Sequence, residues 1–146
     1  ARNGRKLRRP IGAMPGVFQL SPDELVRDAT IAAEAGVPAV LLFGIPDLKD
    51  AKASGACARN GIVQQTVRLL RRELPDLLIL TDVCLCEYMA HGHCGLVQRG
   101  PGGAKVLNDP TLKLLARTAA STALSTPTSS SSSPPNRSRC RSSSSR

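Results

Sequence analysis

The sequence predicts an α/β fold with parallel strands. Two short and continuously apolar segments, residues 39–43 and 77–80, have the composition of strands buried on both faces. Each follows a segment whose apolar residues recur at helical spacing, and a third such segment comes after the second strand. The order helix, strand, helix, strand, helix is typical of a parallel sheet, in which functional residues gather at the carboxyl ends of the strands.

The first predicted helix begins at Ser21 and ends at Gly36. Ser21 is followed by a proline and stands three residues before Glu24, which is the pattern of an N-cap with a capping box. Gly36 is a typical helix end. The apolar face of this helix is formed by Leu25, Ala29, Ala32 and Ala33.

The next segments continue the alternation of helix and strand. Residues 44–60 are rich in Gly, Asp, Lys and Ala and predict a loop. The second helix then runs to Pro75, and the strand at residues 77–80 leads directly to Asp82. After a glycine-rich loop, a third helix is predicted to begin at residues 108–110. The apolar residues of the second and third helices are Val63, Val67, Leu70 and Leu74, and then Leu112, Leu115, Ala116 and Ala119.

A short segment after the second strand holds three of the five cysteines and both histidines. Cys84 and Cys86 are two residues apart, so on an extended strand both thiols would lie on one face. Cys94 follows at a distance that lets the chain turn back to the same point. Three thiolates without an evident fourth ligand are expected for a zinc ion that keeps one position open. In the alternative, a non-enzymatic module, His91 or His93 would complete a closed Cys₃His site.

The net charge of +9 comes from the two ends of the chain. Residues 1–9 form a basic segment, residues 10–125 are electrically balanced and form the predicted domain, and residues 126–146 form a Ser-, Pro- and Arg-rich tail predicted to be disordered. A third interpretation is a basic protein that binds partners through these ends. The scarcity of aromatic residues argues against base stacking, so we do not expect a nucleic-acid partner.

The sequence predicts a cytoplasmic protein with no membrane partner. No apolar run approaches the roughly 20 residues that span a bilayer, and the basic N-terminus lacks the apolar core of a signal peptide. Clustered cysteines also fit a reducing compartment better than a disulfide framework.

Several segments resemble porphobilinogen synthase (5-aminolevulinate dehydratase), in the same order and at similar spacing. The strongest resemblance is at residues 81–88 and 91–95, which are similar to the cysteine-rich motif of the zinc-dependent members. The resemblance covers about residues 8–120. The other matching segments are residues 14–17, 21–25, 36–40, 61–64 and 107–109.

The resemblance implies a (β/α)₈ TIM-barrel lyase, usually a homo-octamer, that condenses two molecules of 5-aminolevulinate to porphobilinogen in tetrapyrrole and haem biosynthesis. It implies that Cys84, Cys86 and Cys94 hold a Zn²⁺ ion that helps to bind the second substrate. It also implies that Asp82 lies in the active site.

The resemblance also implies two lysines that form Schiff bases with substrate, and no lysine here stands in their context. We therefore expect a truncated piece of the barrel that is inactive alone and does not form the octamer. The lysines present are Lys6, Lys49, Lys52, Lys105 and Lys113.

Overall fold

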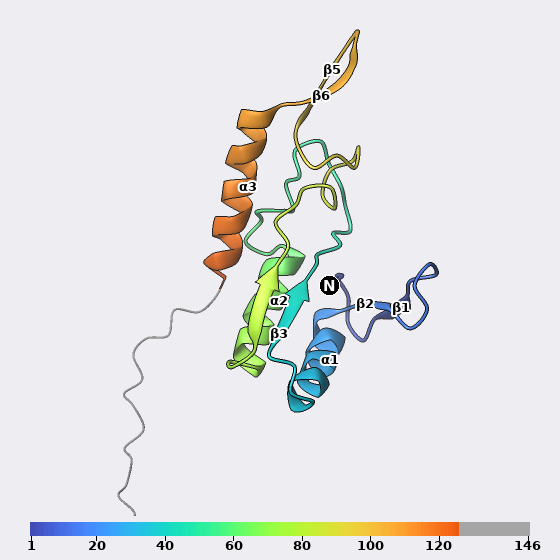
Figure 1. The fold of residues 1–146 in the computed structure, drawn as a ribbon, viewed down its shortest axis with the longest axis vertical. Helices are drawn as coiled ribbons and strands as arrows, with labels where there is room; N and C mark the ends of the chain where they lie inside the picture. Colours follow the sequence, from blue (N-terminus) through green and yellow to red (C-terminus); the bar gives the residue numbers. More distant parts are fainter. Residues whose placement is uncertain (126–146) are drawn as a thin grey trace, which may run out of the picture.

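The computed structural model describes residues 1–125, and the predicted tail lies outside them. The described part contains three helices and six short strands (Figure 1). In chain order they are β1 (Arg8–Pro10), β2 (Phe18–Leu20), α1 (Pro22–Glu34), β3 (Ala39–Leu42), α2 (Ile62–Glu73), β4 (Leu78–Thr81), β5 (Val97–Gly100), β6 (Gly103–Val106) and α3 (Asn108–Ala123).

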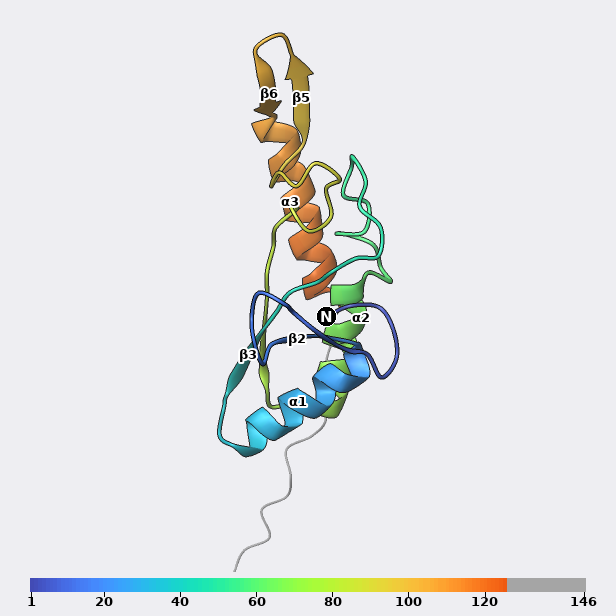
Figure 2. The same ribbon diagram turned by 90° about the vertical axis from the view of Figure 1, so that its right-hand side faces the viewer.

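The prediction of an α/β fold with a parallel strand pair is confirmed. β3 and β4 pair in parallel, from Ala39 opposite Leu78 to Leu42 opposite Thr81. The connection between them passes through α2, and α1 and α2 both lie to one side of the pair (Figures 1 and 2). β1 with β2, and β5 with β6, form separate antiparallel pairs. Residues 1–125 therefore contain three two-stranded sheets and no closed barrel.

Only one face of the β3–β4 pair is covered by the described residues. On that face Leu42 packs with Val63 and Val67 of α2, and Ile79 packs against the same cluster. On the opposite face Leu41, Leu78 and Leu80 are 57%, 55% and 46% exposed. The expectation of strands buried on both faces is thus wrong for this part of the chain, because both helices cover the same side.

Helix α1 begins and ends where the sequence predicts, but it is not capped as predicted. Its first residue follows Ser21, and Gly36 adopts the left-handed conformation with φ +88° just beyond its end. The Ser21 hydroxyl makes no cap bond to the helix. It accepts a hydrogen bond of 2.9 Å from the backbone N–H of Leu7 instead. The predicted capping box is therefore absent, because the Ser21 hydroxyl and the Ser21 N–H both bond to the backbone of Leu7.

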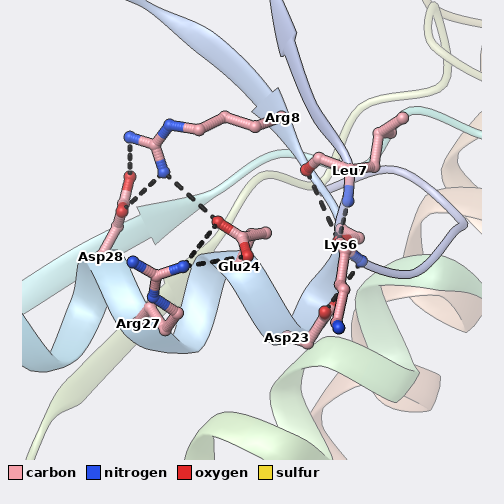
Figure 3. Close-up of polar contacts among 8 residues, drawn as sticks. Lys6, Leu7, Arg8, Asp23, Glu24, Arg27 and Asp28 are labelled. Atoms are coloured by element: carbon pink, nitrogen blue, oxygen red, sulfur yellow. Dashed lines mark hydrogen bonds and ion pairs between the residues drawn. The ribbon is translucent and has the colours of Figure 1, made fainter.

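The N-terminal segment is held against α1 by ionic contacts (Figure 3). The Arg8 guanidinium donates two hydrogen bonds, of 2.9 and 3.0 Å, to the Asp28 carboxylate. Glu24 lies 3.7 Å from Arg8 and also pairs with Arg27 at 3.2 Å. Part of the positive charge at this end is thus neutralised within the fold.

Helix α3 packs through buried threonines as well as through Leu114 and Leu115, which pack against the cluster that contains Leu85 and Met89. Thr111, Thr118 and Thr122 are buried, whereas Leu112 is exposed. The α2 residue Gln64 is buried beside α3, and its Nε2 donates to the Ala56 carbonyl (2.9 Å) and to Ser121 Oγ (2.8 Å). These bonds join α2, the loop before it and α3 into one unit.

Candidate metal centre

The three cysteines meet in a loop at the carboxyl end of β4. The strand ends at Thr81, Cys84 lies in the irregular segment that follows it, and Cys86 lies in a turn. The extended geometry expected for these two residues is therefore wrong. The turns nevertheless place the Cys84 and Cys86 sulfurs 3.4 Å apart. With Cys94, the three sulfurs all lie within 4.8 Å of one another.

The cysteine loop is fixed by side chains that alternate with the thiols along the chain. Leu85, Tyr88 and Met89 are buried in a cluster beneath the loop. Their partners come from the loop before α2 and from α3, so three separate segments meet under the thiols. The other members of this cluster are Ala53, Ala56, Leu96, Leu114 and Leu115.

The loops that follow β3 and β4 are joined by backbone hydrogen bonds. The Asp50 N–H donates to the Tyr88 carbonyl, and the Ala90 N–H donates to the Asp50 carbonyl, both at 3.0 Å. Lys49 Nζ also donates to the Cys86 carbonyl at 3.3 Å. Both loops lie at carboxyl ends of parallel strands, where functional residues are expected in an α/β fold.

The Asp50 side chain stabilises the turn that makes this junction. Its carboxylate accepts hydrogen bonds from the backbone N–H groups of Lys52 (2.7 Å) and Ser54 (3.2 Å). These bonds lower the pKa of Asp50, so the carboxylate is ionised and the turn is intact at neutral pH.

The three thiols differ in the direction of their pKa shifts, and only the pKa of Cys84 is lowered. Burial raises its pKa, but hydrogen bonds from the Cys86 backbone and from the thiols of Cys86 and Cys94 outweigh burial and lower it. The hydrogen bond with Cys84, followed by burial and by Glu87, raises the pKa of Cys86 to about 12. The hydrogen bond with Cys84 also raises the pKa of Cys94. Without a cation, Cys84 is thus the sulfur that most readily carries negative charge.

Asp82 and Glu87 add carboxylates to the same loop. Asp82, Cys84 and Glu87 offer ligand atoms that lie within 4.8 Å of one another, and Glu87 Oε2 lies 3.3 Å from the Cys86 sulfur. Burial raises the pKa of Asp82, and the charge and hydrogen bond of Glu87 raise it further. Glu87 is not among the residues predicted from the sequence. The signal in the sequence that could have identified Glu87 is the position of a carboxylate directly after a Cys-x-Cys pair.

The histidines do not join the thiols. His91 Nδ1 accepts a hydrogen bond of 3.2 Å from the His93 backbone N–H, and the two rings lie 5.3 Å apart. Among residues 1–125, neither histidine belongs to a group of ligand atoms with the cysteines. This arrangement does not favour the closed Cys₃His site.

The donor set itself fits a metal ion. Three sulfurs within 4.8 Å of one another, with carboxylates beside them, could hold a thiophilic divalent cation. The fold and the site together define an α/β protein in which a cluster of thiols, of the kind that can bind a metal ion, lies at the carboxyl end of a parallel strand.

A family model of delta-aminolevulinic acid dehydratase matches residues 1–130. The chain belongs to the delta-aminolevulinic acid dehydratase family.

Curated relatives agree with this assignment. The chain is 47% identical over 120 residues to the delta-aminolevulinic acid dehydratase of Synechocystis sp., covering 82% of this chain and 37% of that protein. It is 45% identical over 122 residues to the enzyme of Halalkalibacterium halodurans, covering 84% of this chain and 36% of the relative. The chain therefore spans little more than a third of the length of these relatives.

A solved structure confirms the fold. The crystal structure of delta-aminolevulinic acid dehydratase (porphobilinogen synthase) from Toxoplasma gondii, in complex with its reaction product porphobilinogen, matches with a TM-score of 0.80 at 31% identity. The match covers 85% of this chain and 35% of that one. Among the described residues of our chain, no helix is both long enough and apolar enough to cross a membrane.

Proposed function

We propose that this chain supplies the metal-binding part of a porphobilinogen synthase active site. The complete reaction would condense two molecules of 5-aminolevulinate to porphobilinogen in tetrapyrrole and haem biosynthesis. The single observation that carries the proposal is the cluster of three thiols at the carboxyl end of β4, in a chain of this family. The bound product in the Toxoplasma gondii structure supports the substrate class.

The metal in this proposal is Zn²⁺, held by Cys84, Cys86 and Cys94. Thiolates favour zinc over harder divalent cations, and their spacing in the loop fits one ion. When bound, zinc supplies a Lewis acid that can polarise an oxygen or bind an amine in its unprotonated form. A reducing compartment such as the cytoplasm would keep the thiols available.

Asp82 is proposed as the active-site carboxyl beside this ion. Its carboxyl belongs to the group that includes Cys84 and Glu87, and burial, with the neighbouring Glu87, raises its pKa. Asp82 could therefore form a hydrogen bond with a substrate group near the thiols. The buried Tyr88 next to it has a pKa of about 12, raised mainly by burial, and stays protonated at neutral pH.

We further propose that residues 10–125 are part of a (β/α)₈ barrel. In such a barrel, helices cover the outer face of each strand and the inner faces pack on one another. Helices α1 and α2 cover one face of β3 and β4, and the uncovered face carries Leu41, Leu78 and Leu80. The exposed apolar face thus has the character of a barrel interior. The homo-octamer would belong to the complete enzyme.

The zinc proposal is tested by titrating the full chain with Co²⁺, a spectroscopic substitute for Zn²⁺, under reducing and anaerobic conditions. We expect one equivalent to bind with thiolate-to-cobalt charge-transfer absorption. Cys84→Ser and Cys94→Ser should each weaken binding by more than the roughly 10–100-fold caused by loss of a residue that only orients a ligand. Cys57→Ser is the matched control, because Cys57 lies outside the thiol cluster. Equal affinity in all four proteins would contradict the proposal.

A second measurement addresses the reaction. Zinc-loaded chain incubated with 5-aminolevulinate should form no porphobilinogen, because none of its five lysines matches a Schiff-base position of the family. Formation of the pyrrole would show that the chain is catalytically sufficient and would contradict this part of the proposal.

A further inference from the structure

We propose that Asp50 is a positioning residue for the thiol cluster, because it holds the loop after β3 in the shape that supports the cysteine loop. This inference rests on the proposed function, since its effect is measured on the ion that the three cysteines bind. Among residues 1–125, Asp50 is not part of a group of metal-ligating atoms. It would therefore act through the backbone and the packing of the cysteine loop.

The backbone of Asp50 fixes one point in the segment that connects Cys86 to Cys94. The Asp50 N–H donates to the Tyr88 carbonyl, and the Asp50 carbonyl accepts from the Ala90 N–H, both at 3.0 Å. Asp50 thereby pairs with the residue between them as an isolated parallel bridge. A fixed point in this segment limits where Cys94 can lie relative to the other two thiols.

The side chain of Asp50 shapes the turn that follows it. Its Oδ1 atom accepts hydrogen bonds from the backbone N–H groups of Lys52 (2.7 Å) and Ser54 (3.2 Å). Between these two donors, Ala53 has a φ of +49°, a left-handed conformation that is uncommon for residues other than glycine. The carboxylate therefore stabilises a turn that the alanine by itself disfavours.

The turn places Ala53 beneath the cysteine loop. Ala53 is fully buried, and it belongs to the cluster that contains Leu85 and Met89. Leu85 separates Cys84 from Cys86 in the sequence, so the packing of Leu85 helps to fix the loop that carries this pair. Without the carboxylate, Ala53 could leave its left-handed conformation, and both the packing and the backbone bridge would shift.

The exposure of Asp50 allows this role to be tested without emptying the core. Asp50 is exposed, so its replacement leaves no buried cavity. Asp50→Ala removes the acceptor of the two hydrogen bonds. Asp50→Asn keeps an Oδ1 acceptor, the atom to which both amides donate, and removes only the charge.

The test measures the Co²⁺ and Zn²⁺ affinities of the full chain and of these two variants under reducing conditions, where circular dichroism shows them to be folded. We expect Asp50→Ala to weaken binding by about 10–100-fold, the usual effect of losing a residue that orients a metal ligand. Asp50→Asn should recover most of this loss. Val67→Ala is the control for stability alone, because Val67 is buried in the cluster under β3 and not in the cluster beneath the thiols. It should unfold at lower urea and keep the metal affinity of the folded chain.

Unchanged affinity in Asp50→Ala, or an equal loss in Val67→Ala, would overturn the inference while leaving the proposed function standing. An Asp50→Asn variant as weak as Asp50→Ala would also contradict the inference, because the acceptor would then not be what matters. Absence of metal binding in the unsubstituted chain would instead overturn the proposed function.

If Asp50→Ala fails to fold, hydrogen exchange in the unsubstituted chain decides the question. Addition of Zn²⁺ should then slow exchange at the backbone amides of Lys52 and Ser54, because an ordered cysteine loop would hold the turn closed. Unchanged exchange at both amides would contradict the inference.

Discussion

Gly44 lies where the end of the sheet meets the cysteine loop, at a position that has no room for a side chain. It lies just beyond the end of β3, at a point where α2 and Tyr88 approach the backbone. A Cβ atom at this position would overlap Val63 and would lie 2.7 Å from the Tyr88 hydroxyl oxygen. The absence of a side chain therefore allows the loop after β3 to pack against both neighbours.

We expect Gly44→Ala to lower the free energy of unfolding by about 1–3 kcal/mol, the usual cost of overpacking a close contact. Tyr88 would have to move, so the loop that carries Cys86 should move with it. Urea denaturation measures the loss. Gly12→Ala is the control, because a Cβ at Gly12 meets nothing within 4 Å. Equal stabilities of the two variants would contradict this explanation.

At the same scale, some residues of the site could be predicted from the sequence and others could not. The cysteines are evident because three thiols cluster within a short segment. Glu87 and the Asp50 junction are not evident, because their importance depends on turns that bring particular atoms together. Glu87 becomes important once the chain turns at Cys86, and Asp50 contacts the cysteine loop across a long stretch of sequence.

Among the elements, the packing of α2 against α3 depends on a buried polar side chain. Gln64 is 1% exposed, and its amide nitrogen bonds both to the loop before α2 and to Ser121 of α3. Its Oε1 has no partner within the described structure. The amide therefore holds two elements together through its donor side alone.

We expect Gln64→Ala to destabilise the protein by about 1–3 kcal/mol, because the buried Ala56 carbonyl and Ser121 hydroxyl would lose their donor. Gln65→Ala, on the exposed side of the same helix, should cost less. Urea denaturation of both variants checks the difference. A loss at Gln65 as large as that at Gln64 would show that helix propensity, and not the buried bonds, explains the effect.

The strength of the apolar pattern explains why some helices and strands could be predicted and others could not. The three helices and the two parallel strands follow from apolar periodicity and from strong end signals such as Gly36 and Pro75. The β1–β2 and β5–β6 hairpins are short and mostly exposed, so they leave no alternating apolar pattern. On α3, the apolar pattern correctly points to Leu115, which packs against the buried cluster, but it does not point to the buried threonines.

For the whole molecule, the dominant feature is the uncovered face of β3 and β4. Leu41 and Leu80 are opposite each other in the register and both are exposed, as are Leu78 on β4 and Phe43 just after the end of β3. Contiguous exposed apolar surface of this kind favours association between chains. Unpaired strand edges favour it further.

We expect the chain to self-associate with increasing concentration, and Leu41→Lys to shift it toward the monomer. Sedimentation velocity over a range of concentrations measures this. Leu112→Lys is the control, because Leu112 is exposed to a similar degree, 55% against 57%, but lies on α3 away from the sheet. A chain that stays monomeric at high concentration, or an equal effect of both substitutions, would contradict the role of this face.

The alternation of thiols and core residues in the cysteine loop has a thermodynamic consequence. The segment from Cys84 to Met89 carries two kinds of side chain. Its thiols would bind the ion, and its buried apolar side chains belong to the cluster that packs against Leu114 and Leu115 of α3. Ion binding and helix docking are therefore linked equilibria, and each must strengthen the other by the same free energy. An ion that binds only the folded loop would add about 2.7 kcal/mol to stability at a free concentration of 100 times its Kd. The supply of metal would then govern how firmly α3 is held, as well as the chemistry at the thiols.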